Sequence, residues 1–242
     1  MEGWLCRTGL LLGEEGLARL WGAKVALLGL GGVGGSCAEA LCRAGVGSLM
    51  LVDNDEVAIS NLNRQLIATL DTVGRPKTEA MAERLLAINP QISLTLFRQF
   101  YLPENSFFLY DWQPDLVLDA IDTVTAKLHL AQECRRLGIP LVSCLGTGNR
   151  LSPQHLTAGD ITETVSTGCP LARVMRRELR RRGIEHLRVV YSTEPAQKAV
   201  VPGDENAGRH PPGSISFVPP VAGYILASEG IRLLLEQAGE NK

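Results

Sequence analysis

Three glycines early in the chain have the spacing of a loop that binds phosphate. Gly29, Gly31 and Gly34 fit the pattern G-x-G-x-x-G between an apolar run at 24–29 and an amphipathic segment at 36–45. Glycine lets the backbone approach a phosphate, and the free amides at the start of the following helix favour its negative charge. The same glycines could serve only to pack a strand tightly against a helix, and this alternative stays open.

Acidic residues follow two runs that are predicted to be neighbouring strands. Asp53 ends one run, about 20 residues after Gly34, where dinucleotide-binding folds place an acid that hydrogen-bonds a ribose hydroxyl. Asp55 doubles this acid, and Asp119 and Asp122 end a later run. Since the carboxyl ends of neighbouring parallel strands converge on one crevice, we expect these acids to meet the glycine loop at one ligand.

Two cations between these acids favour ATP over a nicotinamide cofactor. Arg64 lies in the segment 61–65 (NLNRQ), and Lys77 lies in the first turn of a predicted helix, against the helix dipole. Beside a polyphosphate, both would stabilise the charge that develops as phosphate is displaced. Asp122 is a plausible Mg²⁺ ligand, directly or through water. Arg64 could instead form a surface ion pair, and Asp122 could cap the helix predicted at 124–137.

The order of the elements predicts an α/β fold that is Rossmann-like and doubly wound, with a mainly parallel sheet and a C-terminal elaboration. Buried strands are expected at 24–29, 48–53, 92–97, 116–118 and 140–145, and helices at 36–45, 76–88 and 124–137. The less regular remainder suggests a strand near 155–159, a basic helix at 170–182 and an apolar helix near 218–236.

At 242 residues the chain is predicted to form a single adenylating domain over 1–242. Its core is expected at 20–150, and the C-terminal elaboration at 151–242. Residues 195–214 are rich in proline, glycine and charge, so we expect a mobile loop there that could act as a lid.

The charge balance limits what the whole surface can bind. The 24 Lys and Arg residues nearly balance the 26 Asp and Glu residues, which excludes a uniformly basic nucleic-acid binder but not a basic patch. The predicted helix at 170–182 supplies such a patch, because its arginines recur at helical spacing on one face. We expect that face to contact RNA through Arg173, Arg176, Arg177 and Arg180. The alternative is a plain solvated face without a ligand.

Six cysteines without any C-x-x-C spacing argue against a zinc site made from paired thiolates. The N-terminus shows no signal-peptide pattern, and the apolar runs look too short and too rich in glycine to span a bilayer. We therefore expect a cytoplasmic protein with free thiols and no membrane partner.

Five segments between residues 29 and 122, GLGGVGG, LVDND, NLNRQ, VGRPK and DAID, resemble the ThiF/MoeB/HesA superfamily of bacterial relatives of ubiquitin-activating enzymes. The resemblance implies that ATP adenylates a carboxylate and that pyrophosphate leaves. It implies ATP contacts, position by position, at Gly29, Gly31, Gly32, Gly34, Asp53, Asp55, Asn61, Arg64, Lys77, Asp122 and Lys127. It also implies catalytic roles for Arg64, Lys77 and Asp122, the last with Mg²⁺, and a homodimer in which Arg7 reaches the partner's site.

Within the superfamily the sequence is most similar to the tRNA threonylcarbamoyladenosine dehydratase group, through the segments 170–183 and 213–234 and the missing C-x-x-C pairs. This implies that the carboxylate belongs to N6-threonylcarbamoyladenosine in tRNA and that the neighbouring carbamoyl group closes a ring. It is also compatible with a sulfur-transfer or desulfurase-type protein as a partner. Cys169 departs from the group's usual Asp before Pro170, and a weak helix cap is its ordinary role.

Three other functions stay open. Adenylation of a ubiquitin-like or sulfur-carrier protein would require a partner that ends in Gly-Gly, and the missing zinc pairs disfavour it. A nucleotide-binding adaptor without activity is disfavoured by the presence of Arg64, Lys77 and Asp122 together. An NAD dehydrogenase would leave those three residues without a task.

Overall fold

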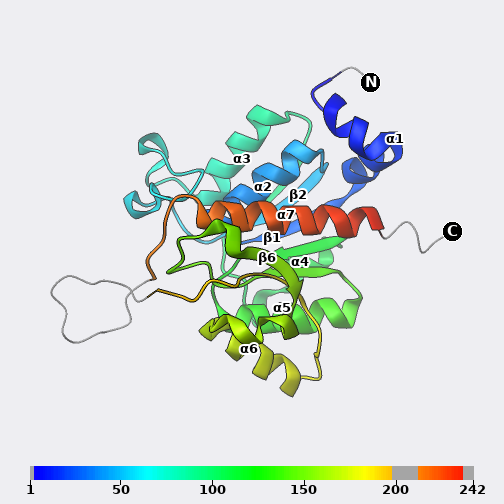
Figure 1. The fold of residues 1–242 in the computed structure, drawn as a ribbon. Coiled ribbons are helices and arrows are strands. Elements are labelled where there is room, and N and C mark those ends of the chain that lie inside the picture. Colours follow the sequence, from blue (N-terminus) through cyan, green and yellow to red (C-terminus); the bar gives the residue numbers. More distant parts are fainter. Residues whose placement is uncertain (1–2, 198–211, 237–242) are drawn as a thin grey trace.

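One sheet of seven strands organises the fold. The computed structural model describes residues 3–197 and 212–236, and in them the strands lie in the order β3-β2-β1-β4-β5-β7-β6 (Figure 1). The strands are β1 Lys24–Leu28, β2 Ser48–Val52, β3 Ser93–Phe97, β4 Leu116–Asp119, β5 Leu141–Cys144, β6 Leu156–Asp160 and β7 Arg188–Ser192. All neighbours are parallel except β6 and β7, so most strands end along one edge of the sheet.

Helices cover both faces of this sheet. One face carries α2 (Gly32–Ala44), α3 (Lys77–Ile88) and α7 (Val218–Glu236), and the other carries α4 (Phe107–Asp111), α5 (Val124–Leu137) and α6 (Pro170–Arg181). Leu27 packs in the core under α7, whereas its neighbour Leu28 packs in the core under α5. Since both faces are buried, the central strands are mostly apolar. The predicted α/β fold, doubly wound with a mainly parallel sheet, is confirmed.

The predicted strands and helices correspond to elements of the structure within a few residues. Among the α-helices and strands, three had no predicted counterpart: α1 (Cys6–Gly22), α4 and β7. Helix α1 is kinked at Gly13, whose φ is 69°, and its N-cap residue makes no side-chain hydrogen bond, so it lacks the usual start signal. Strand β7 has only a short apolar stretch. Most of the expected mobile loop at 195–214 lies outside the described residues, because these stop at 197 and resume at 212.

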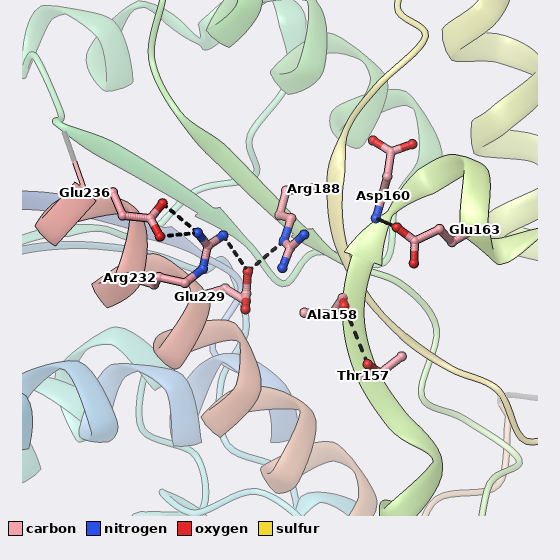
Figure 2. A network of polar contacts seen from close by, with 8 residues as sticks. All are labelled: Thr157, Ala158, Asp160, Glu163, Arg188, Glu229, Arg232 and Glu236. Atoms are coloured by element: carbon pink, nitrogen blue, oxygen red, sulfur yellow. Dashed lines mark hydrogen bonds and ion pairs between the residues drawn. The ribbon is translucent and has the colours of Figure 1, made fainter. Parts of the chain in front are cut away.

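Helix α7 corrects the expectation that no apolar segment is long enough to cross a membrane, because it meets that test by length and composition. In the fold it runs beside α2 across the sheet (Figure 1). One ion pair joins its C-terminal half to the sheet: Glu229 Oε2 lies 2.6 Å from Arg188 Nε on β7, and within the helix it also lies 3.1 Å from Arg232 Nη2 (Figure 2). Its residues contact four strands and two helices, as those of a core helix do.

The turn between β1 and α2 brings backbone against backbone. A methyl group on Gly34 would lie 1.7 Å from the carbonyl oxygen of Gly29, and one on Gly29 would lie 2.7 Å from the carbonyl oxygen of Ala120. Gly29 also has a φ of 89°, a conformation that favours glycine. Gly31 differs, because the nearest atom to a methyl group there would be Gln65 Nε2 at 3.9 Å. Packing therefore explains Gly29 and Gly34 but leaves Gly31 unexplained.

We expect Gly34→Ala to destabilise the fold by about 3 kcal/mol or more, because its methyl group would collide with backbone rather than with a movable side chain. Gly31→Ala is the matched control, and it should stay within about 1 kcal/mol of the wild type at this helix N-cap position. Thermal and urea unfolding followed by circular dichroism measure both. Equal stability of the two variants would contradict the packing role of Gly34.

Candidate functional site

Asp53 holds the glycine turn in place from the end of β2. Its Oδ2 accepts a hydrogen bond from the Leu30 amide at 2.6 Å, and its Oδ1 accepts one from the Asp55 amide at 2.8 Å. Burial raises the pKa of Asp53, and the nearby Lys77 charge and these two amides oppose the shift. The carboxylate predicted to bind ribose is thus half-buried directly beside the turn, with its shape fixed by backbone contacts.

The N-terminus of α2 points its first turn toward this edge of the sheet. Gly31 is the N-cap residue and has no side chain to satisfy the helix amides. Gln65 is buried beside Gly31, and its Oε1 has no hydrogen-bond partner among the described residues. Helix α2 has 13 residues, and no side chain caps its first turn. Its N-terminus is therefore suited to an anion. The sequence pattern did not single out Gln65. Only its burial beside Gly31 identifies it as a residue of the site.

Lys77 begins α3 and lies almost entirely below the surface. Its Nζ is 2.6 Å from Asp55 Oδ2, and its side chain is 6% exposed, against 58% for that of Asp55. Its amide also donates to the Asp55 carbonyl oxygen. The pair places one cation beside Asp53 and one accessible carboxylate at the site. The predicted position of Lys77 in the first turn of a helix is confirmed.

The segment that carries Asn61 and Arg64 packs against the glycine turn. A methyl group on Gly32 would lie 3.5 Å from Arg64 Cγ. The guanidinium of Arg64 donates to the Ser60 carbonyl oxygen and to Asn63 Oδ1, both at 2.8 Å. Among the described residues it forms no ion pair with a carboxylate, so the alternative of a surface ion pair is wrong for that part of the chain.

Asn61 and Asn63 fix this segment from within. Asn61 is buried, and its Oδ1 accepts from the Ala58 amide at 3.1 Å. Asn63 Nδ2 donates to the Ser214 carbonyl oxygen at 3.0 Å, which ties the segment to the chain that leads into α7. The geometry gives Asn61 a local role in shaping the turn that presents Arg64.

Asp119 and Asp122 have opposite environments at the end of β4. Asp119 is fully buried, and its Oδ1 accepts from the Ile121 amide at 3.0 Å. Asp122 is exposed, and its only hydrogen bond among the described residues is a long one from Thr123 Oγ1, at 3.4 Å. Thr123, not Asp122, is the N-cap residue of α5, so the helix-cap alternative for Asp122 is wrong. Its carboxylate is left available to a ligand.

Lys127 does not extend toward this edge. Its side chain has no exposed surface, and its Nζ donates to Asp119 Oδ2 at 2.9 Å, Ser143 Oγ at 3.2 Å and the Cys144 carbonyl oxygen at 2.7 Å. An ammonium group has three donors, and all three are engaged here. The structure therefore gives Lys127 partners inside the protein instead of the contact that the resemblance implies.

Arg7 lies at the opposite edge of the sheet. Leu5, two residues earlier, packs against Gly45, which caps the C-terminal end of α2. Because α2 has 13 residues, about 20 Å separate that end from Gly31. Arg7 is exposed and is not brought to the site of its own chain.

The arginines of α6 lie outside this group as well. Arg173, Arg176, Arg177, Arg180 and Arg181 line a cavity of about 500 Å³ together with Thr162 and Val165. The predicted arrangement on one side of a helix is confirmed. The first turn of α6 begins near the end of β5, since Leu171 lies 3.8 Å from the methyl position of Gly146. This basic groove thus starts at the edge where the strands end.

Cysteine chemistry and a multidentate metal site find no support in the described residues. No group of three or more His, Cys, Asp or Glu side chains gathers there. All six cysteines are free. Burial raises the pKa of the Cys134 and Cys144 thiols to about 12, which keeps them protonated and unreactive at neutral pH.

One polar group lies at the carboxyl edge of β1, β2 and β4. It consists of the glycine turn, Asp53, Asp55, Arg64, Lys77 and Asp122. An uncapped helix N-terminus and two cations can hold a polyphosphate. An acid fixed beside the turn can hold a ribose, and an exposed acid can hold a hydrated cation. The arrangement is suited to chemistry at a nucleotide phosphate.

Comparison with known proteins agrees with this geometry. The tRNA threonylcarbamoyladenosine dehydratase of Bacillus subtilis is 40% identical in an alignment that covers 95% of this chain and 94% of that protein. The Escherichia coli enzyme of the same name is 39% identical over 72% of this chain and 64% of its own length. The crystal structure of that enzyme with ATP superposes with a TM-score of 0.87 and 33% identity, over 98% of this chain and 95% of that one. A model of the ThiF family matches residues 6–242. The chain therefore belongs to the ThiF family.

Proposed function

We propose that this chain is an ATP-dependent tRNA threonylcarbamoyladenosine dehydratase. One observation carries the proposal: the similarity to the dehydratases continues beyond the nucleotide-binding half and through β6, α6, β7 and α7, so that 95% of the chain is matched. The threonyl carboxylate of the modified adenosine is the group that ATP activates. The chain acts as a single adenylating domain, with its core at 20–150 and its elaboration at 151–242.

The reaction has two steps. A carboxylate oxygen attacks the α-phosphorus of ATP, and pyrophosphate leaves. The neighbouring carbamoyl group then attacks the activated carbonyl carbon, loses its proton to solvent and closes a ring as AMP leaves with the carboxyl oxygen. The second step needs no enzyme nucleophile, because the reacting groups belong to one molecule and are already close. The unreactive buried thiols are consistent with this route.

The chain's own residues have distinct tasks in this proposal. The α2 amides near Gly29, Gly31, Gly32 and Gly34 face the phosphates, and Asp53 accepts from the ribose while it fixes the turn. Arg64 and Lys77 stabilise the charge that develops on the phosphates as pyrophosphate leaves. Asn61 presents Arg64, and Asp55 orients Lys77.

Asp122 is the residue that would hold Mg²⁺. Its exposed carboxylate has only one long internal hydrogen bond, and Mg²⁺ in such sites needs few protein ligands because phosphates and water complete its shell. Bound there, the ion would neutralise phosphate charge.

The proposal includes a homodimer in which Arg7 completes the site of the partner. The far position of Arg7 in its own chain supports a role in trans, and exposed apolar residues on α1 provide contact area. Leu10 is 83% exposed, and Leu11 is 87% exposed. A cytoplasmic location accords with a tRNA substrate and six free cysteines. A sulfur-transfer or desulfurase-type partner is a further part of the proposal.

The basic groove of α6 is proposed to bind tRNA phosphates. Glu178 pairs with Arg177, Arg181 and Arg182, but Arg173 and Arg180 have no carboxylate partner within residues 3–197 and 212–236. Arg176 donates to the Thr164 carbonyl oxygen at 2.8 Å, which holds its guanidinium against one wall. The positive charge that is left beside the carboxyl edge suits an RNA backbone that enters the site.

The exchange of pyrophosphate into ATP tests the substrate. Exchange should depend on tRNA that carries the threonylcarbamoyl group and should be at background with unmodified tRNA or without RNA, because only the modified tRNA supplies the carboxylate. A mass shift of the nucleoside that equals the loss of water measures the second step. Exchange driven by a carrier protein that ends in Gly-Gly, and not by the modified tRNA, would favour the carrier-activation alternative.

Mixed dimers test Arg7 and Lys77 together. Arg7→Ala and Lys77→Ala should each lose activity, and mixing the two should recover about one quarter of wild-type activity, since half of the dimers then hold one intact site in a twofold arrangement. Turnover after subunit exchange measures this. Recovery should be absent when Lys77→Ala is mixed with Arg64→Ala, because both lesions lie in the same half-site. Full activity of either single variant would contradict the proposed site.

Salt dependence tests the groove on α6. The variant Arg173→Ala/Arg180→Ala should bind tRNA more weakly and should lower the slope of log Kd against log salt by about 1 to 2, because fewer counterions are released. Arg43→Ala/Arg136→Ala removes the same charge from arginines paired with glutamates on α2 and α5. That control should leave the slope unchanged. An unchanged slope in the α6 variant would remove the groove from the tRNA site.

A further inference from the structure

A buried polar cluster lies directly beneath the turn that presents Asp122. Asp119 ends β4, Ser143 lies opposite it on β5, and Lys127 reaches both from α5. Ser143 Oγ donates to Asp119 Oδ2 at 2.6 Å, and Lys127 Nζ is 2.9 Å from the same oxygen. Neither charged side chain has exposed surface, so the cluster is sealed from solvent and from any ligand.

The second oxygen of Asp119 controls the turn above it. Asp119 Oδ1 accepts from the Ile121 amide at 3.0 Å, while the Ala120 amide donates to the Leu28 carbonyl oxygen at 2.8 Å. The carbonyl of Ala120 in turn packs against Gly29, which opens the glycine turn. The backbone that carries Asp122 is therefore fixed between the glycine turn on one side and the Asp119 carboxylate on the other.

Lys127 supplies the countercharge that the buried Asp119 carboxylate needs. A buried carboxylate needs a countercharge and hydrogen-bond donors, and Lys127 supplies the charge while Ser143 supplies a second donor. Oδ2 is saturated by these two groups, which leaves Oδ1 directed at Ile121. Without Lys127 the buried carboxylate would have to rearrange, and the turn that depends on Oδ1 would move with it.

We propose that Lys127 is a positioning residue that acts through Asp119 on the turn 119–122, with Ser143 as its assistant, and that it does not contact the nucleotide. This inference rests on the proposed function, in which Asp122 serves the ATP site. It assigns a task to a residue of the family pattern whose side chain is sealed inside the protein.

Hydrogen exchange on the nucleotide-free protein provides a test that needs no activity. In Lys127→Met the peptide that covers 119–124 should exchange at least about tenfold faster than in the wild type, while α6 keeps its wild-type protection. Asp119→Asn/Lys127→Met should recover most of the protection, because the asparagine oxygen still accepts from Ile121 and no buried charge is left. Wild-type exchange rates in Lys127→Met would overturn the proposal.

Pyrophosphate exchange separates positioning from direct contact. Lys127→Met should lower kcat at least about tenfold, with KM for ATP within about threefold of wild type, and the double variant should regain part of that kcat. A direct nucleotide contact predicts instead a raised KM and no recovery in the double variant, since the ammonium group is missing in both.

Arg188→Leu controls for general instability. It removes one cation from a partly buried ion pair at the start of β7, away from the edge where Asp122 lies, and Glu229 keeps Arg232 as a partner. It should lower thermal stability but leave the kinetics of pyrophosphate exchange near those of the wild type. If Lys127→Met lost activity only in proportion to its stability, as Arg188→Leu did, the positioning role would be wrong. A wild-type protein without pyrophosphate exchange would refute the proposed function alone, because hydrogen exchange would still decide the role of Lys127.

Discussion

The close approach of α2 to the backbone of β1 is the constraint on which the site depends. Gly34 lies so near the carbonyl oxygen of Gly29 that any side chain would overlap it. Because of this contact, the α2 axis starts at the carboxyl edge of the sheet, and its N-cap residue Gly31 has no side chain to accept hydrogen bonds from the first amides. Asp53 fixes the turn from β2 and the backbone of Ala120 fixes it from β4, so two neighbouring strands share in its shape.

The same constraint divides the glycines into two kinds. Gly29 and Gly34 are required by packing, and this holds for any fold in which a strand turns so sharply into a helix. Gly31 has open space beyond its α-carbon, and packing does not explain it. Packing therefore accounts for two of the three glycines in the motif, and the proposed phosphate contact is the explanation offered for Gly31. The acids divide similarly, since Asp119 serves the interior and Asp122 faces outward.

Sequence patterns predicted the elements with a clear apolar run or helical periodicity and missed those whose apolar signal is brief or interrupted. The runs at 24–28 and 48–52 each hold four consecutive apolar residues, whereas β7 (RVVYS) holds three between polar ends and α1 is interrupted by Gly13. Spacing also placed Asp53, Arg64 and Lys77 correctly around the glycine turn. It could not reveal that Lys127 points inward, because position in a motif does not specify which way a helix faces. That direction follows from packing of α5 on β4 and β5.

Separation of charge explains how a chain with a net charge of −2 can bind one polyanion at the carboxyl edge of the sheet and, as proposed, a second one beside it. Lys77 pairs with Asp55 at the site, and Lys127 pairs with Asp119 in the interior beneath it. Glu178 is shared among three arginines of α6 and its C-cap, so this segment keeps an excess of positive charge. An average over the surface therefore conceals a local field, and at a Debye length of about 8 Å only that local field reaches a bound phosphate. Net charge excludes indiscriminate binding of nucleic acid while it leaves recognition at one groove intact.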